Sequence, residues 1–220
     1  MKKYIDILQE CPIFADISKE NLISILSCLD AKVLRFSKNE VIFLEGESID
    51  SVGILLSGNA QIVRNDYYGN RNIITNIDPS QLFAESFAFA EVNSIPVSVI
   101  STDTTEVLLI KSHKISKACN NSCDFHNRLI LNLLKIMAMK NIFFNQKSEI
   151  TSKKTTKEKL LAYLMHQAKL NNSNKFTIPF NRQELADFLE VDRSGLSVEI
   201  SKLRQNKIIE CHKNNFTLLK

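Results

Sequence analysis

The spacing of apolar residues divides the chain into helical and strand-like stretches. Residues 4–10 and 18–29 repeat apolar positions at helical spacing, with a break at Pro12 between them. The chain then changes to short β-type runs, which turn residues such as Gly46 and Gly58 separate. These runs are residues 32–36, 41–44, 52–56, 61–63, 72–77, 97–101 and 106–110. Many short strands at near-regular spacing predict an antiparallel barrel or jelly roll.

A long helix without Gly or Pro is predicted over residues 124–147. Two apolar stripes run along it, so one face can pack on the β-type domain while the other packs on a second copy. The stripe expected to form this homodimer seam is Leu129, Leu133, Ile136, Lys140 and Phe143. The second stripe is Ile130, Leu134, Met137 and Phe144. The alternative is a single buried helix, which would need a larger domain to cover both stripes.

The polar and basic segment 150–159 predicts a hinge. It ends in a capping-box pattern, in which Thr155 is followed three residues later by Glu158. A helix over residues 160–168 and a short strand over residues 176–180 are expected to follow. Movement at such a hinge would re-aim whatever the last part of the chain binds.

Two helices joined by a tight turn are predicted over residues 181–209. Asn181 can cap the first helix, with Glu184 in the position that completes a capping box. Asp192, in the turn, can cap the second helix. A hairpin of two short strands is expected afterwards, at residues 208–212 and 216–219. This order of elements is that of a winged helix-turn-helix.

The second helix of this pair has one apolar and one polar face. Its expected buried residues are Leu196, Ile200 and Leu203. The polar face suits DNA recognition, because the first residues of a recognition helix meet base edges while Lys and Arg neutralise phosphates. The residues expected to contact DNA are Arg182, Arg193, Ser194, Ser197, Val198 and Lys202. An ordinary amphipathic helical pair with a solvated charged face is the alternative.

Charge is distributed unevenly along the chain. Residues 1–146 contain 14 Lys and Arg against 16 Asp and Glu, whereas residues 147–220 contain 14 against 8. The positive charge is therefore concentrated in the part with the helix-turn-helix pattern, which indicates double-stranded DNA as a partner.

Composition narrows the class of protein further. A chain of 220 residues with 44% apolar residues has room for two modest domains. No apolar run is long enough to span a bilayer, and the acidic residues near the N-terminus do not fit a secretory signal, so we expect a cytoplasmic protein without a membrane partner. The five Cys are scattered, which favours reduced thiols. No nucleophile elbow, phosphate loop or zinc-protease motif is present, so the chain is not expected to be an enzyme.

The segment SVGILLSGNAQIVRNDYYGNRNIITNIDPSQLFAESFAF, together with the later helix-turn-helix, resembles the cyclic-AMP receptor and fumarate-nitrate regulator (CRP/FNR) family of bacterial transcription regulators. The resemblance implies an α+β chain with three parts: a cyclic-nucleotide-binding-like β-roll (jelly roll) in residues 1–120, a dimerisation helix and hinge in residues 121–150, and a winged helix-turn-helix in residues 151–220.

The resemblance also implies a function. It predicts a transcription regulator that binds a near-palindromic operator as a homodimer under the control of a small-molecule effector, and that contacts RNA polymerase if it activates transcription. Family members commonly use an Arg five residues after the position of Arg193, where this chain has Val198, so its preferred half-site is expected to differ. The alternative function is a small-molecule, redox or metal sensor whose C-terminal domain docks a protein partner.

The chain departs from the family's cyclic-nucleotide binders. Ala84 and Glu85 stand where those proteins have Gly-Glu, and Ile95 and Pro96 stand where they have Arg-Ser. Ile95 cannot neutralise a phosphate, and Pro96 has no backbone N–H to donate. Cyclic AMP is therefore not the expected effector, and no cofactor is required.

A more apolar effector pocket is expected instead. Its candidate residues are Phe83, Glu85, Phe87, Phe89, Ile95, Pro96 and Val97, with Arg64 and Arg71 as nearby cations that could still hold a phosphate. The aromatic residues of this set are equally suited to filling the core of the β-roll.

One group of Cys and His residues has a spacing compatible with metal, haem or redox chemistry. Cys119, Cys123 and His126 would share one face of a helix, a pattern that metal, haem or redox sites can use. Cys11 and Cys28 do not match the clustered cysteines of the family's iron-sulfur branch. The alternative for Cys119 and Cys123 is packing, because Cys near a domain junction is often a small apolar residue.

Overall fold

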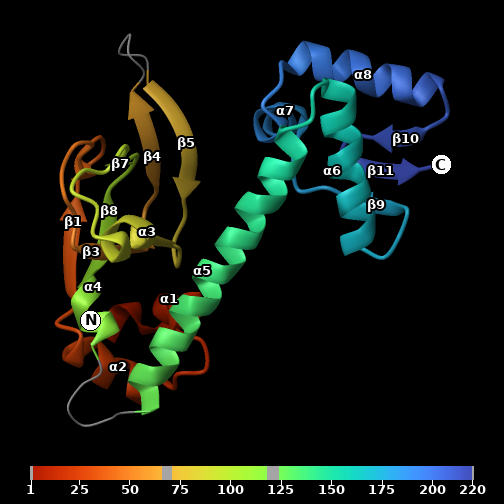
Figure 1. Cartoon of the computed structure of the whole chain (residues 1–220). Coiled ribbons are helices and arrows are strands. Elements are labelled where there is room, and N and C mark those ends of the chain that lie inside the picture. Colours follow the sequence, from red (N-terminus) through yellow and green to blue (C-terminus); the bar gives the residue numbers. More distant parts are fainter. Residues whose placement is uncertain (1, 66–70, 118–123, 220) are drawn as a thin grey trace. The chain divides into compact units, whose positions relative to one another are not determined.

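The computed structural model describes residues 2–65, 71–117 and 124–219 (Figure 1). The chain forms two compact units, Met1–Ala138 and Met139–Lys220. Their boundary lies inside one uninterrupted helix, α5 (Asp124–Thr151).

The first unit begins with short helices that pack into a common core with the start of α5. They are η1 (Lys2–Tyr4), α1 (Ile5–Glu10), η2 (Pro12–Phe14) and α2 (Lys19–Cys28). Pro12 begins η2, where its missing N–H leaves no helical bond unmade. Ser18 caps α2 by accepting a hydrogen bond of 3.4 Å from the backbone N–H of Asn21. Leu8, Leu22 and Leu129 are buried together in this core.

Two four-stranded antiparallel sheets make up the rest of the first unit. Their strands are β1 (Lys32–Phe36), β2 (Val41–Phe43), β3 (Ser51–Ser57), β4 (Ala60–Asn65), β5 (Arg71–Ile77), β6 (Leu82–Phe83), β7 (Ser98–Ser101) and β8 (Thr105–Lys111). The strand orders are β1-β8-β3-β6 and β2-β7-β4-β5. Leu55 and Val107 of the first sheet and Val99 of the second share one core, so the sheets face each other as in a jelly roll. The predicted fold class is confirmed, while β6 and the short helices α3 (Glu85–Ala90) and α4 (Ser112–Ser116) were not predicted.

The second unit is a winged helix-turn-helix built on the end of α5. Its elements are α6 (Thr156–Leu170), β9 (Lys175–Thr177), α7 (Arg182–Leu189), α8 (Arg193–Gln205), β10 (Ile209–His212) and β11 (Asn215–Leu218). The sheet order is β10-β11-β9. Leu160, Leu185 and Phe216 lie in one core, so the first helix, the helix-turn-helix and the hairpin pack as one body.

Two predicted boundaries were too wide. The predicted hinge over residues 150–159 shrinks to residues 152–155, because Ile150 is buried in the second core and keeps α5 helical to Thr151. Thr155 then starts α6 with the predicted capping box, accepting a bond of 3.2 Å from Glu158 N–H while the Glu158 carboxylate accepts one of 3.1 Å from Thr155 N–H. The strand expected over residues 176–180 is limited to Lys175–Thr177, since Pro179 cannot donate to a ladder.

Within the described part of the chain, none of the helices is both long and apolar enough to cross a membrane.

Candidate nucleic-acid interface

Helix α7 begins with the capping box that the sequence predicted. The side-chain oxygen of Asn181 accepts hydrogen bonds from the backbone N–H groups of Gln183 (2.9 Å) and Glu184 (3.0 Å). The Glu184 carboxylate in turn accepts a bond of 2.7 Å from Asn181 N–H. These local bonds fix where the first helix of the pair starts.

The turn between α7 and α8 is held by side chains on both sides. Glu190 ends α7 in the left-handed conformation, with φ of 55°. Lys159 of α6 donates to the carbonyl oxygens of Leu189 (3.2 Å) and Glu190 (3.4 Å), which places a cation at the negative end of α7. On the other side of the turn, Asp192 caps α8 as predicted, accepting a bond of 2.8 Å from Gly195 N–H.

The carboxylate of Asp192 is also bonded by the hydroxyl of Ser194. This hydroxyl and then the Gly195 N–H hold the pKa of Asp192 below its usual value. The start of α8 is therefore defined by a charged cap at neutral pH.

Helix α8 has a buried face and an exposed face. Leu196, Ile200 and Leu203 are buried in the second core. Five of the six residues predicted to contact DNA lie on the exposed surface of this helix: Arg193, Ser194, Ser197, Val198 and Lys202. A surface depression runs beside them, lined by Ser197, Val198, Ser201, Lys202 and Gln205. Val198 is 51% exposed, although its side chain is apolar.

Several polar groups of α8 already have partners within the helix. The hydroxyl of Ser197 donates to the Arg193 carbonyl oxygen at 3.0 Å, and that of Ser201 donates to the Ser197 carbonyl oxygen at 3.0 Å. Lys202 pairs with Glu199 at 2.6 Å. Among the described residues, the Arg193 guanidinium makes no hydrogen bond or ion pair, so it is available to a partner.

The sixth predicted residue, Arg182, is placed differently. Its guanidinium lies over the Phe216 ring, 5.2 Å from the centroid, and one nitrogen is 3.4 Å from the sulfur of Cys211. Arg182 is half-buried and packs α7 on the hairpin.

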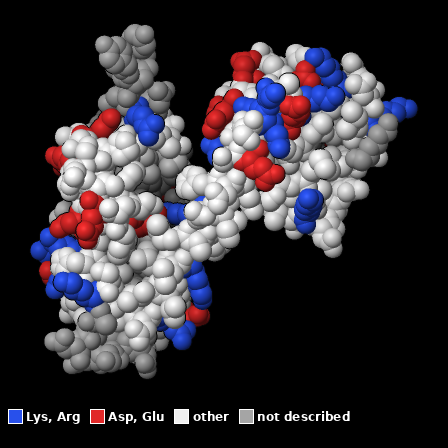
Figure 2. Space-filling model, viewed as in Figure 1, with Lys and Arg blue, Asp and Glu red and all other residues white. Residues whose placement is uncertain are grey.

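Charge on the second unit is mixed. Figure 2 shows Lys and Arg side chains interspersed with Asp and Glu over the visible face of this unit. The excess of basic residues in the C-terminal part of the sequence therefore does not form a uniform positive surface on that face.

The candidate effector region lies in the first unit, where Phe83 fills the β-roll. The Phe83 side chain is 3% exposed and packs between the two sheets. Its ring lies over Gly53, where an added Cβ would overlap the ring, and it meets Phe43 edge-on with centroids 6.0 Å apart. Ile95 and Val97 are buried as well. Phe87 and Phe89 are half-buried.

One of the positions that differ from cyclic-nucleotide binders has an unusual backbone conformation. Ala84 adopts a left-handed φ of 64°, a conformation that glycine adopts more easily. Glu85, which follows it, is buried. The backbone N–H of Ile95 donates to the Glu47 carbonyl oxygen at 2.9 Å, so it is not free for an anion.

One of the two nearby cations is already engaged. Arg64 Nε donates to the Pro96 carbonyl oxygen at 3.3 Å. Arg71 belongs to β5, but its side chain lies outside the described residues.

The predicted Cys and His cluster is only partly visible, because Cys119 and Cys123 lie outside the described residues. His126 is buried, with Nε2 at 2.9 Å from the Ile115 carbonyl oxygen. Its Nδ1 has no hydrogen-bond partner in the part of the chain that the structure describes. That same part contains no group of three or more His, Cys, Asp or Glu able to hold a metal ion.

The stripe predicted for the homodimer seam is largely covered within the chain. Leu129 and Leu133 are buried in the first core, and Ile136 packs against it. On the same side of α5, Asn132 donates to the carbonyl oxygens of Ile13 (3.0 Å) and Ala15 (2.8 Å). The last members of that stripe are not in this core: Lys140 is half-buried, and Phe143 contacts Phe188 of the second unit.

The opposite side of α5 carries exposed apolar residues that sequence reasoning did not group together. They are Leu131 (56% exposed), Leu134 (59%), Ala138 and Ile142 (55%), spaced as neighbours along one helix face. Helical spacing alone could not identify this exposed face, because the bonds that bury Asn132 on the other side join it to residues 13 and 15, far away in the sequence.

Comparisons with known proteins agree with this arrangement. Residues 33–122 match the cyclic nucleotide-binding domain, and residues 158–220 match the Crp-like helix-turn-helix domain. Two similar proteins are the transcriptional activator protein Anr of Pseudomonas protegens, 24% identical over 84% of this chain and 76% of that protein, and the transcriptional activator protein FnrA of Stutzerimonas stutzeri, 24% identical over 83% and 74%. The catabolite activator protein of Thermus thermophilus shares the fold, with a TM-score of 0.51 and 16% identity over 94% of this chain and 93% of that one.

Proposed function

The chain belongs to the CRP/FNR family of DNA-binding transcription regulators, and we propose that it binds a near-palindromic operator as a homodimer under the control of an effector other than cyclic AMP. Members of this family regulate transcription and are not enzymes. A protein with this function acts in the cytoplasm, where the operator DNA lies.

The exposed face of α8 supports the proposed contact with DNA. Arg193 stands in the first turn with an unengaged guanidinium, where a recognition helix meets base edges. Lys202, farther along the same face, suits a phosphate once its pair with Glu199 opens. Because Val198 is exposed beside them, an apolar contact such as a thymine methyl fits that position better than a guanine.

The exposed apolar face of α5 supports the homodimer. Leu131, Leu134 and Ile142 would otherwise remain in water, and a second copy of the same helix is a partner with a matching face. A twofold dimer presents two α8 helices, which is why a near-palindromic operator is expected. The curated relatives are named transcriptional activators, which supports activation through RNA polymerase.

Three observations favour an effector other than cyclic AMP. Ile95 is apolar and buried, and its N–H is used by Glu47. Pro96 has no N–H, and its carbonyl oxygen holds Arg64. At Ile95 and Pro96 a cyclic phosphate would therefore meet neither a cationic side chain nor a free backbone N–H.

The test is fluorescence anisotropy with the full chain and labelled DNA. Operators are first selected from a random duplex library, and binding is then measured at two salt concentrations. Selected sequences with twofold symmetry and an affinity that falls steeply with salt are expected. Affinity that does not change with salt, or no selected sequence at all, would favour the alternative in which the C-terminal unit docks a protein.

A further inference from the structure

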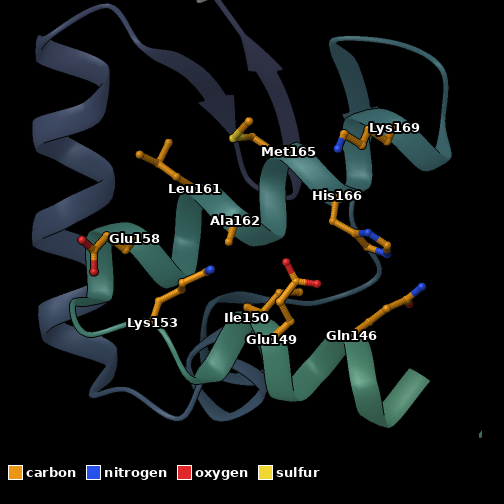
Figure 3. A pocket seen from close by; sticks show the side chains of 10 residues that line it. All are labelled: Gln146, Glu149, Ile150, Lys153, Glu158, Leu161, Ala162, Met165, His166 and Lys169. Atoms are coloured by element: carbon orange, nitrogen blue, oxygen red, sulfur yellow. The ribbon is translucent and has the colours of Figure 1, made fainter. Parts of the chain in front are cut away.

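A pocket of about 510 Å³ lies in the second unit, between the last turns of α5 and one face of α6. Ten residues line it: Gln146, Glu149, Ile150, Lys153, Glu158, Leu161, Ala162, Met165, His166 and Lys169. Figure 3 shows Glu149 and Gln146 projecting from α5 toward α6, and His166 projecting from α6 toward α5. Volumes of roughly 300–1,000 Å³ are usual for small-molecule sites.

The floor of this pocket is apolar. Ile150 is 5% exposed and belongs to the second core, and Leu161 and Ala162 pack against that core. Met165 is 55% exposed, although it is a large apolar side chain. An apolar group placed here would remove this surface from water, and the flexible thioether of Met165 can adjust to its shape.

The polar groups around the floor carry both signs of charge. Within the described residues, the side chains of Glu149, Lys153 and Lys169 make no ion pair or hydrogen bond. Glu158 is different, because its carboxylate is used in the cap of α6. Figure 3 places Lys153 and Lys169 toward opposite ends of the pocket, with the Glu149 carboxylate between them.

This combination selects one class of ligand. A purely anionic ligand would meet the unpaired Glu149 carboxylate, and a purely cationic ligand would meet two unpaired lysines. A ligand with one ammonium and one carboxylate satisfies both signs. An apolar side chain on the same molecule would cover the floor.

We propose that this pocket binds a zwitterion with an apolar side chain, an α-amino acid or a dipeptide. Glu149 holds the ammonium group, Lys153 holds the carboxylate, and Leu161 and Met165 cover the side chain. Lys169, at the far end, makes a weaker outer contact. The bound molecule joins the end of α5 to α6 across residues 152–155, and its binding does not depend on the proposed DNA contact.

Calorimetric titration of the full chain tests this site. The ligands are L-leucine, L-phenylalanine and leucyl-leucine, each compared with hexanoate, hexylamine and glycine. At least one apolar zwitterion is expected to bind with Kd below about 1 mM, and at least tenfold more tightly than the three comparison compounds. Leucine against leucyl-leucine decides between the two members of the class.

Single substitutions then assign the contacts. Glu149→Gln and Lys153→Gln are each expected to weaken binding at least tenfold, and Lys169→Gln less than threefold. The matched control is Lys157→Gln, an exposed lysine of α6 outside the pocket, which is expected to leave Kd unchanged. Thermal unfolding of each variant shows that the fold is kept.

Three results would overturn the proposal. They are the absence of binding by all three zwitterions, equal binding of hexanoate or hexylamine, and unchanged affinity in both Glu149→Gln and Lys153→Gln. If these two variants instead change the dimer dissociation constant and no amino acid binds, a second copy of the chain is the occupant of the pocket.

Discussion

The candidate functional residues of α8 and those of the β-roll differ in their surroundings. On α8, Arg193 and Val198 lie in solvent on a helix whose other face is fixed by the core. In the β-roll, Phe83 is packed on Gly53 and Arg64 is bonded to Pro96. The first region is preformed for a partner, whereas the second satisfies its own groups. The exposed side chains of α8 can still meet a partner, whereas Phe83 and the Arg64 Nε already have partners within the first unit.

Replacing Phe83 tests whether the β-roll is closed by its own core. Phe83→Ala removes a ring that is 3% exposed, and the expected loss is about 3–5 kcal/mol in the free energy of unfolding of the first unit. Urea unfolding of the full chain measures it. Phe87→Ala, at a half-buried position, is the control and should lose less than half as much. A loss below about 1 kcal/mol for Phe83→Ala would mean that the interior is an open site comparable to the face of α8.

The two sides of α5 offer a second contrast. Leu134→Asp places a carboxylate on the exposed face, so the monomer should fold while dimerisation weakens by roughly 100-fold or more, because the seam would bury an unpaired charge. Analytical ultracentrifugation measures the dissociation constant. Ile136→Asp is the matched variant, and it should destabilise the first unit because Ile136 packs on that core. If only Ile136→Asp separates the dimer, the seam lies on the stripe first predicted from the sequence.

These contrasts show which features local sequence can predict. The caps of α6, α7 and α8 depend on residues three positions apart, such as Thr155 with Glu158 and Asn181 with Glu184, and each was predicted correctly. Which face of α5 is buried depends instead on residues that are distant in the sequence, since Asn132 bonds to Ile13. With two apolar stripes on one helix, spacing alone cannot decide which of them the N-terminal helices cover.

The role of Phe83 in the predicted effector region also depends on residues that are distant in the sequence. Whether Phe83 lines a cavity or fills it depends on Gly53, thirty positions earlier on a neighbouring strand, where the missing side chain leaves room for the ring. The sequence left both interpretations open, and the packing favours the filled interior. The hinge was placed too broadly because Ile150 looks like part of a polar segment until the second core is seen to include it.

Arg193 is the residue with which to test the α8 face itself. Arg193→Ala is expected to weaken binding to the selected operator by about 1–3 kcal/mol, roughly 5- to 150-fold, because the contact between the guanidinium group and DNA is lost. Fluorescence anisotropy measures the change. Arg193→Lys separates two roles: a phosphate contact survives this substitution, and a bidentate contact to guanine does not. Wild-type affinity in Arg193→Ala would remove this residue from the interface.

A smaller effect is expected from the acidic neighbour of Lys202. Glu199→Gln breaks the 2.6 Å pair with Lys202 and removes a negative charge beside the proposed phosphate contact, so DNA affinity should rise a few-fold. The stability of the second unit should fall by only about 0.2–0.5 kcal/mol. The same anisotropy assay at low and high salt checks it, since the gain should shrink as salt screens the charges. Unchanged affinity at low salt would mean that this part of α8 lies away from the phosphates.

The smallest predicted effect concerns the cap of α8 and its dependence on pH. The Ser194 hydroxyl and the Gly195 N–H lower the pKa of Asp192 in the folded protein, so the ionised form is favoured by folding. This contribution to stability is fully present above the unfolded pKa of about 4 and is lost as the pH falls through the lower folded value. Asp192→Asn keeps a capping side chain without a titrating group, so its stability between pH 5 and about 3 should vary less than that of the wild type. Urea unfolding across that range makes the comparison, and identical pH profiles for the two proteins would show that Asp192 does not carry this dependence.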